Sequence, residues 1–177
     1  IPNLILPIIK FIYNHCDLIL VSSRGFIDSI IEKGISKNKI QFFPQWAESI
    51  FKPKSKVDDL LDTIPSSSFV IMFAGNIATG QDFPAIIKAA EILKNKKNIH
   101  WVILGDGSKK TWAEQKVNNL NLNNNFHFLG SFPLSEMPKF YSNADAMLFS
   151  LEKEYIYSIT IPAKVQTYLA CGKPVLA

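Results

Sequence analysis

Residues 69–76 read Phe69-Val-Ile-Met-Phe-Ala-Gly-Asn76, an apolar run that ends in a small-residue turn. A short continuous apolar run closed by glycine is typical of a strand buried on both faces of a parallel sheet. Apolar residues then recur at helical spacing over 85–94, with Pro84 near the first helical position. The stretch therefore predicts a strand followed by a helix.

The same succession repeats along the chain and predicts an α/β fold with a parallel sheet. After the first unit we expect strands over 99–104, 126–129 and 146–150, and helices over 108–120, 135–141 and 162–170. A further strand begins at Lys173, and we expect the sequence to stop inside it. Before the first unit we expect a strand over 17–21, a helix over 24–33 ended by Gly34, and a strand over 39–43.

Composition shifts between Phe51 and Ser68, where two prolines, three lysines, three aspartates and a run of serines occur. Such a stretch is typical of a domain crossing. We expect one domain to end at residue 53, a linker over 54–67, and a second domain over 68–177.

Charge and cysteine content exclude several classes of protein. The net charge of +4 over 177 residues suits phosphate-bearing ligands, but without a dense basic run it does not indicate nucleic acid binding. Two cysteines without ligand spacing indicate a reducing compartment and no zinc site. The apolar opening Ile1–Val21 carries prolines and charges and does not predict a membrane span or a signal peptide. We expect this opening to lie within a longer protein.

Ligands of open parallel sheets bind beyond the carboxyl ends of the strands, so the loops there hold the candidate residues. Two glycine-containing loops could approach a phosphate closely, or could be ordinary turns. The third loop offers an aromatic side chain that could stack on a base, although Phe132 is better explained as core. These loops contain Gly75, Asn76 and Gln81; Gly105, Asp106 and Gly107; and Ser131 and Phe132.

The fourth loop carries Ser158, Ile161 and Pro162, followed by Lys164 and Gln166. A lysine in the first turn of a helix opposes the helix dipole, and a bound diphosphate would resolve that conflict. A solvated lysine at a frayed helix start explains it equally well. The three histidines, His15, His100 and His127, lie far apart along the chain and are expected to be structural. Neither the dinucleotide nor the P-loop glycine signature occurs.

In order and spacing, these elements resemble the donor-binding half of the retaining GT-B glycosyltransferases of the large group-one family. The resemblance covers nearly the whole chain and rests on five successive stretches: 73–81, 102–107, 128–130, 141–145 and 168–175. It implies a Rossmann-like sheet with helices on both faces, which is half of a GT-B fold, preceded by a βαβ remnant of the acceptor domain. It also implies a cytoplasmic hexosyltransferase, without metal or cofactor, that acts in bacterial surface polysaccharide synthesis.

The sequence departs from this family at its charged positions. The family carries Arg and Lys in the first loop, where this chain has Asn76 and Gln81, and two Glu where it has Ser158 and Gln166. The stretch 161–166 resembles a subgroup that builds amino-deoxysugar polysaccharides, which implies a UDP-linked donor and a lysine that takes over diphosphate neutralisation. The implied roles are catalysis by Lys164 and Ser158. The resemblance assigns binding of the diphosphate to Gly75, Asn76, Gln81, Ile161, Pro162 and Lys164. It assigns binding of the base and ribose to Gly105, Asp106, Gly107, Ser131, Phe132 and Gln166.

The partners implied are a nucleotide diphosphate sugar, and a glycan or lipid-linked acceptor held by a preceding N-terminal domain. Peripheral contact with the inner membrane face follows if the acceptor is a lipid. An alternative is a non-catalytic nucleotide-sugar-binding module, which the missing acidic pair favours. A periplasmic-type or flavodoxin-like binding domain ranks last, because neither an export signal nor an acidic phosphate loop occurs.

Overall fold

The computed structural model describes residues 5–58 and 60–177 in two compact units. The first unit combines residues 1–46 with 153–162, and the second combines 47–152 with 163–177. Residues 1–4 of the apolar opening and Asp59 of the expected linker lie outside the described residues.

The second unit is built on a five-stranded sheet in which every pair of neighbours is parallel. Its strands lie in the order β5-β4-β3-β6-β7, so β3 occupies the centre. Their bounds are Phe69–Ala74 (β3), Ile99–Leu104 (β4), Phe126–Gly130 (β5), Ala146–Leu148 (β6) and Val175–Leu176 (β7). The predicted parallel α/β fold is confirmed.

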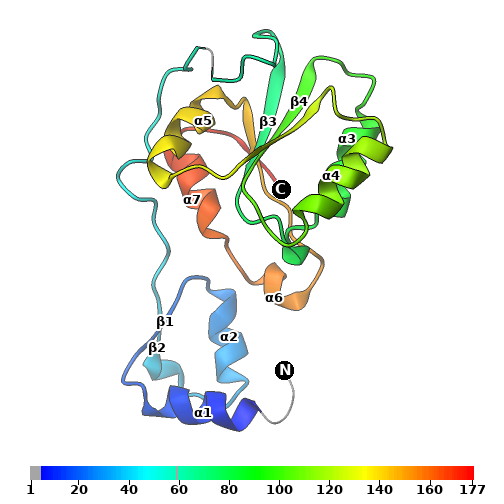
Figure 1. Ribbon diagram of the computed structural model, residues 1–177. Helices are drawn as coiled ribbons and strands as arrows, with labels where there is room; N and C mark the ends of the chain where they lie inside the picture. Colours follow the sequence, from blue (N-terminus) through cyan, green and yellow to red (C-terminus); the bar gives the residue numbers. More distant parts are fainter. Residues whose placement is uncertain (1–4, 59) are drawn as a thin grey trace. The chain divides into compact units, whose positions relative to one another are not determined.

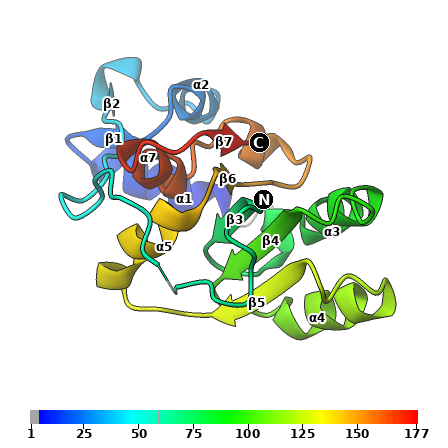
Figure 2. The same ribbon diagram turned by 90° about the horizontal axis from the view of Figure 1, so that it is seen from above.

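Helices cover both faces of this sheet (Figures 1 and 2). On one side lie α3 (Phe83–Ile92) and α4 (Lys110–Asn119), and on the other α5 (Met137–Asn143) and α7 (Ala163–Ala170). Two single 3₁₀ turns, η2 (Thr79–Gln81) and η3 (Leu134–Glu136), precede α3 and α5. Because every crossover is β-helix-β, the helix N-termini face the carboxyl ends of the strands.

The central strand β3 supplies side chains to two separate cores. Val70 and Met72 pack toward α5 and α7, whereas Ile71 and Phe73 pack toward α3 and α4. From Val70 to Ala74 every residue of this strand is buried, as expected for a strand covered on both faces. Burial on both faces explains why the sequence of this strand is an uninterrupted apolar run.

The first unit contains two short parallel strands and three helices among its described residues. These are α1 (Leu6–His15), β1 (Ile19–Val21), α2 (Gly25–Ile31), β2 (Ile40–Phe42) and α6 (Tyr155–Ser158), with the 3₁₀ turn η1 over Lys37–Lys39. The βαβ arrangement was predicted, but α1 and α6 were not. Pro7 lies in the first turn of α1, where the fixed φ of proline suits a helix start, so it does not break this helix.

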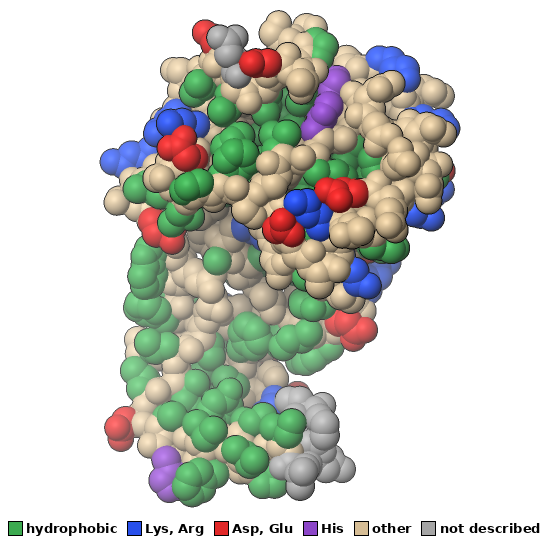
Figure 3. Space-filling view, in the orientation of Figure 1, with side chains coloured by type: hydrophobic (Ala, Val, Ile, Leu, Met, Phe, Trp, Pro, Cys, Tyr) green, Lys and Arg blue, Asp and Glu red, His purple; other side chains and the backbone are tan. Residues whose placement is uncertain are grey.

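One face of α1 is apolar and exposed. Ile8, Phe11 and Ile12 are 58%, 65% and 52% exposed, and they share a face because they are three or four residues apart. Figure 3 shows hydrophobic side chains across the visible surface of this unit. In the part of the chain that is described, no helix is both long and apolar enough to cross a bilayer.

Two histidines that are far apart along the chain meet in the second unit. His100 Nδ1 and His127 Nε2 are 3.0 Å apart, and their rings are nearly parallel, with an angle of 13°. Val102 stands opposite His127 in the β4–β5 register, so both imidazoles lie on one face of the sheet. Burial lowers the pKa of both groups, and the pKa of His127 is lowered further by the charge that His100 would carry.

We expect the second unit to lose stability on mild acidification because of this pair. The unfolded chain binds protons at these two imidazoles near pH 6.5, whereas the folded protein resists protonation, so stability falls as pH drops from 7 to 5. Each proton of difference contributes a slope of at most about 1.4 kcal/mol per pH unit. Urea unfolding followed by circular dichroism at several pH values measures this slope. It should be shallower in His127→Gln, and an unchanged slope would exclude the pair as its cause.

Candidate functional site

A pocket of about 370 Å³ opens at the carboxyl edge of the five-stranded sheet. The ends of β3 and β4, the loop after β5 and the start of α5 form its walls. Its lining residues are Ala74, Gly75, Asn76, Leu104, Gly105, Asp106, Ser131, Phe132, Leu134, Met137 and Tyr141. Six of the candidate site residues from three separate loops therefore surround one cavity.

Backbone hydrogen bonds join the three loops. Gly75 N–H donates to the Leu104 carbonyl at 2.9 Å, and Gly105 N–H donates to the Gly130 carbonyl at 2.7 Å. Ile77 N–H donates to the Asp106 carbonyl at 2.8 Å. The loops therefore continue the sheet hydrogen bonding beyond the strands and hold the pocket floor rigidly.

Gly105 is required at this floor for a steric reason. Its φ of +138° lies in the region that other residues rarely adopt. A Cβ atom there would overlap with the carbonyl oxygen of Gly75, which is backbone and has no rotamer to change. The two strand ends can approach this closely only without side chains.

Lys164 reaches the same loops from the first turn of α7. Its Nζ atom donates to Gln81 Oε1 at 2.5 Å and lies 4.2 Å from the centroid of the Phe73 ring. It is also close to Gly75, since a Cβ built on that glycine would lie 2.9 Å from Nζ. Gln81 and Lys164 are 83 positions apart in sequence, and the fold brings them together.

The environment of this ammonium group is largely apolar. Burial lowers the pKa of Lys164 to about 8. None of the ion pairs found among residues 5–58 and 60–177 includes Lys164, and its ammonium group contacts the neutral amide of Gln81 and the face of the Phe73 ring. A partly buried cation without a carboxylate partner is a strong candidate for anion binding.

Asp106 contributes a carboxylate at the rim of the pocket. Its Oδ2 atom accepts from Lys110 Nζ at 3.0 Å, and its Oδ1 atom accepts from the Gly107 N–H at 2.7 Å. The hydrogen bond from Lys110, and then that from Gly107, lower the pKa of Asp106. The carboxylate stays ionised, and its negative charge is offset locally by Lys110.

Phe132 is not buried in the core, contrary to the explanation favoured from sequence. It is 39% exposed and rests against Phe140, with ring centroids 4.3 Å apart. Ser131 is exposed beside it. Pro133 follows directly and leads into η3, which keeps the ring in the loop and out of the helix. Part of the Phe132 side chain is therefore accessible from the pocket.

Several candidate residues do not line this pocket. Ser158, Ile161 and Pro162 belong to the first unit, where Ser158 Oγ donates to the Tyr155 carbonyl at the end of α6. Gln166 is half-buried on α7. The roles expected for these four residues stay predictions.

Sequence reasoning missed two tyrosines of the site. Tyr141 lines the pocket, and burial raises its pKa to about 12. Tyr168 is fully buried and bonds the backbone of Ala74 at the end of β3. The spacing of Tyr168 four residues after Lys164 places both on one helix face and was the available signal.

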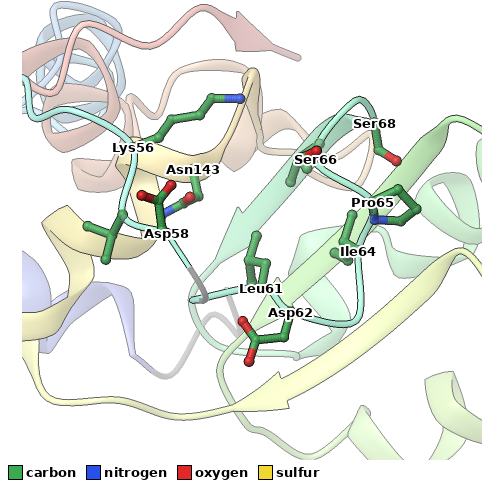
Figure 4. A pocket seen from close by; sticks show the side chains of 11 residues that line it. Lys56, Asp58, Leu61, Asp62, Ile64, Pro65, Ser66, Ser68 and Asn143 are labelled. Atoms are coloured by element: carbon green, nitrogen blue, oxygen red, sulfur yellow. The ribbon is translucent and has the colours of Figure 1, made fainter.

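A second cavity, of about 440 Å³, lies at the opposite end of β3 (Figure 4). Lys56, Asp58 and Asp62 line it from the segment before β3, and Asn143 lines it from the end of α5. It is larger than the pocket at the carboxyl edge, but helix N-termini and the glycine loops are at the other end of the sheet. The carboxyl-edge pocket is therefore the better candidate.

The sequence of residues 62–177 matches the family described as glycosyl transferases group 1. The match covers well over half of the chain. The chain belongs to the group 1 glycosyltransferases. The resemblance seen in the sequence is thereby confirmed.

Two bacterial proteins that are similar to this chain in sequence are named as glycosyltransferases. WcaI of Escherichia coli K12, named a colanic acid biosynthesis glycosyl transferase, is 27% identical over 90% of this chain and 40% of its own length. WbjE of Pseudomonas aeruginosa, named a glycosyltransferase, is 28% identical over 99% of this chain and 44% of its own. The chain thus spans less than half of these group 1 relatives.

Solved structures agree with the fold. The Anabaena protein Alr3699/HepE in complex with UDP superposes with a TM-score of 0.83, at 15% identity, over all of this chain and 49% of that protein. WaaG, a glycosyltransferase involved in lipopolysaccharide biosynthesis, gives a TM-score of 0.72 at 14% identity, over 88% of this chain and 42% of that protein. The half GT-B arrangement predicted for this group 1 chain is confirmed.

We expect Gly105→Ala to damage the pocket and the fold together. The added methyl group meets the Gly75 carbonyl at a φ that alanine avoids, so the two loops must separate, at a cost of about 2–3 kcal/mol. Chemical denaturation measures the loss of stability. Gly130→Ala is the matched control, since its φ is also positive but a Cβ there has no atom within 4 Å. Equal losses in both variants would contradict the steric explanation.

Proposed function

We propose that this chain is the donor-binding part of a glycosyltransferase that moves a hexosyl group from a UDP-linked sugar to a glycan or lipid-linked acceptor. The observation that carries the proposal is the position of Lys164 Nζ, which lies beside Gly75 and Gln81 without a carboxylate partner among the ion pairs of the described residues. A diphosphate at this point would provide the missing counter-charge. The setting is bacterial surface polysaccharide synthesis, as the names of the relatives suggest.

Lys164 would act on the leaving group. Negative charge grows on the diphosphate as the glycosidic bond breaks, and a fixed cation in a poorly solvated place stabilises that charge more than it stabilises the intact donor. The loop from Gly75 to Gln81, with Asn76 between them, would border the same oxygens. The N-terminus of α7, with Ile161 and Pro162 before it, would add its dipole. Ser158 is assigned to the sugar by the family resemblance alone.

The nucleoside would occupy the pocket next to this charge. We assign the base to Ser131 and Phe132, because Phe132 is partly exposed in the pocket and an aromatic ring can stack on a base. Gly105, Asp106 and Gly107 would border the nucleoside, and the amide of Gln166 would bond the ribose hydroxyls. No metal enters this assignment.

Residues 1–53, most of which belong to the first unit, are proposed to be the end of an acceptor-binding domain, followed by a linker over 54–67. The exposed apolar face of α1 supports this proposal, since such a face is normally covered by other parts of a domain. The whole protein would act in the cytoplasm, with peripheral contact to the inner membrane face when the acceptor is a lipid. Its excess of basic over acidic residues supports that contact.

A second candidate is a nucleotide-sugar-binding module without catalysis. It is favoured by Ser158 and Gln166, which stand where the family has two glutamates. The two candidates differ in one property of the full-length protein. The enzyme releases UDP from its donor in the presence of acceptor, whereas the module binds the donor and releases nothing.

We expect the affinity of this chain for UDP to fall as pH rises through about 8, because the pKa of Lys164 is lowered to that value. Only the protonated ammonium attracts the diphosphate, and binding raises its pKa, so a proton is taken up in this window. Affinity should drop toward tenfold per pH unit well above 8. Isothermal titration from pH 7.5 to about 9 measures this dependence, in a range where the diphosphate of UDP is fully ionised and its uracil ring is mostly uncharged.

Lys164→Met is the decisive variant for that experiment. Methionine has a similar length and fills the space over Phe73 without charge. The variant should bind UDP more weakly and lose the pH dependence above 7.5. Lys109→Met, which removes an exposed lysine outside the pocket lining, is the matched control. It should keep both the UDP affinity and the pH dependence of the wild-type chain. A pH dependence that survives in Lys164→Met would remove Lys164 from the site.

We also expect UDP to bind more tightly than GDP or ADP, and Gln166→Ala to weaken all three nucleotides alike. The base distinguishes the nucleotides, whereas the ribose that Gln166 would contact is common to them. One lost neutral hydrogen bond corresponds to roughly a fivefold change in affinity. A titration followed by NMR measures both effects. Absence of binding by any of the three would refute the donor-site proposal.

A further inference from the structure

Tyr168 lies one turn after Lys164 on α7, and its side chain is fully buried. Its hydroxyl group accepts a hydrogen bond from the Ala74 N–H at 3.1 Å and donates one to the Ala74 carbonyl at 3.0 Å. Ala74 is the last residue of β3 and directly precedes the glycine loop. One side chain therefore satisfies both backbone groups at the end of the central strand.

The end of β3 needs this partner because β6, the neighbouring strand on the side of Tyr168, ends before β3 does. β6 pairs with β3 only from Ile71 to Phe73, whereas β4 continues on the other side to Ala74 and Gly75. Backbone groups of successive strand residues point to opposite edges, so those of Ala74 face the side where β6 has stopped. Left without partners in a buried place, they would each cost about as much as a lost hydrogen bond. The Tyr168 hydroxyl replaces the missing strand.

We propose that Tyr168 is a positioning residue for Lys164, a role that rests on the proposed binding of a diphosphate by that lysine. Residues four apart lie on one face of a helix, so Lys164 and Tyr168 both face the end of β3. The hydroxyl fixes α7 against Ala74, and the ammonium group thereby stays over Phe73 and beside Gly75. α7 has only eight residues, so a fixed point in one turn sets the position of the other.

Tyr168 also supports a wall of the pocket. Its ring meets that of Tyr141 edge to face, with centroids 5.3 Å apart and an angle of 84°. Tyr141 lines the pocket at the carboxyl edge. Movement of α7 would therefore shift both the cation and one side of the nucleoside pocket.

Tyr168→Phe tests this role, because it removes the hydroxyl and keeps the ring. The readout is the pKa of the Lys164 ammonium, followed by NMR in protein with labelled lysine, with the resonance assigned by its loss in Lys164→Met. We expect the pKa to rise from about 8 toward the ordinary lysine value of about 10.4 as the ammonium becomes more solvated. We also expect UDP affinity, measured below pH 7.5, to fall roughly tenfold.

Val117→Ala provides a control for lost stability alone. Val117 is buried on α4, in the core on the other face of the sheet, and its truncation destabilises the unit without touching α7. A folded Tyr168→Phe in which the pKa of Lys164 and the UDP affinity match those of Val117→Ala would overturn the proposal. If the wild-type chain binds no UDP, the donor-site proposal fails, and the pKa of Lys164 alone decides the role of Tyr168.

Amide hydrogen exchange keeps the proposal testable if Tyr168→Phe does not fold. In the wild-type chain the Ala74 amide should exchange as slowly as that of Met72 in the middle of the strand, because the hydroxyl protects it. Fast exchange at Ala74 beside slow exchange at Met72 would mean that the hydroxyl bond does not persist, and would overturn the proposal.

Discussion

The close approach of the Gly75 and Gly105 backbones is the constraint on which the site depends. The carbonyl of Gly75 occupies the space where any other residue at 105 would place its Cβ. This contact lets the sheet hydrogen bonds run past the ends of β3 and β4 into their loops. The loops consequently form a rigid floor, and the two glycines contribute no side chain to the pocket above it.

The charge of the proposed site comes from a different element than the family resemblance implies. In the first loop, Asn76 and Gln81 stand at the positions where that resemblance implies Arg and Lys. Lys164 reaches this loop from α7, and its partner there is Gln81, one of the two replaced positions. The substitution at Gln81 is thereby explained: a cation there would repel the ammonium of Lys164, whereas the amide oxygen accepts its hydrogen bond.

Much of the fold was predictable because each buried strand is an apolar run and each loop after it contains glycine or a polar residue. Strand Ile99–Leu104 was predicted to the residue, and the loops that line the pocket were expected to hold candidate residues because each follows a strand. Contacts between distant elements were not predictable, because they depend on the register in which neighbouring strands pair, and a sequence pattern does not give that register. The His100–His127 pair, and the hydroxyl of Tyr168 at Ala74, depend on which strands end side by side.

Burial of Lys164 has an electrostatic advantage that an exposed cation in the loop would lack. Desolvation makes the free ammonium less stable, which is why its pKa is lowered. The same poorly solvated surroundings weaken the screening of its attraction to an anion. A ligand that brings negative charge therefore recovers the cost of burial on binding, and gains more as its charge increases in the transition state. A buried lysine held by neutral partners thus favours the departing diphosphate over the intact donor, which is the distinction that catalysis requires.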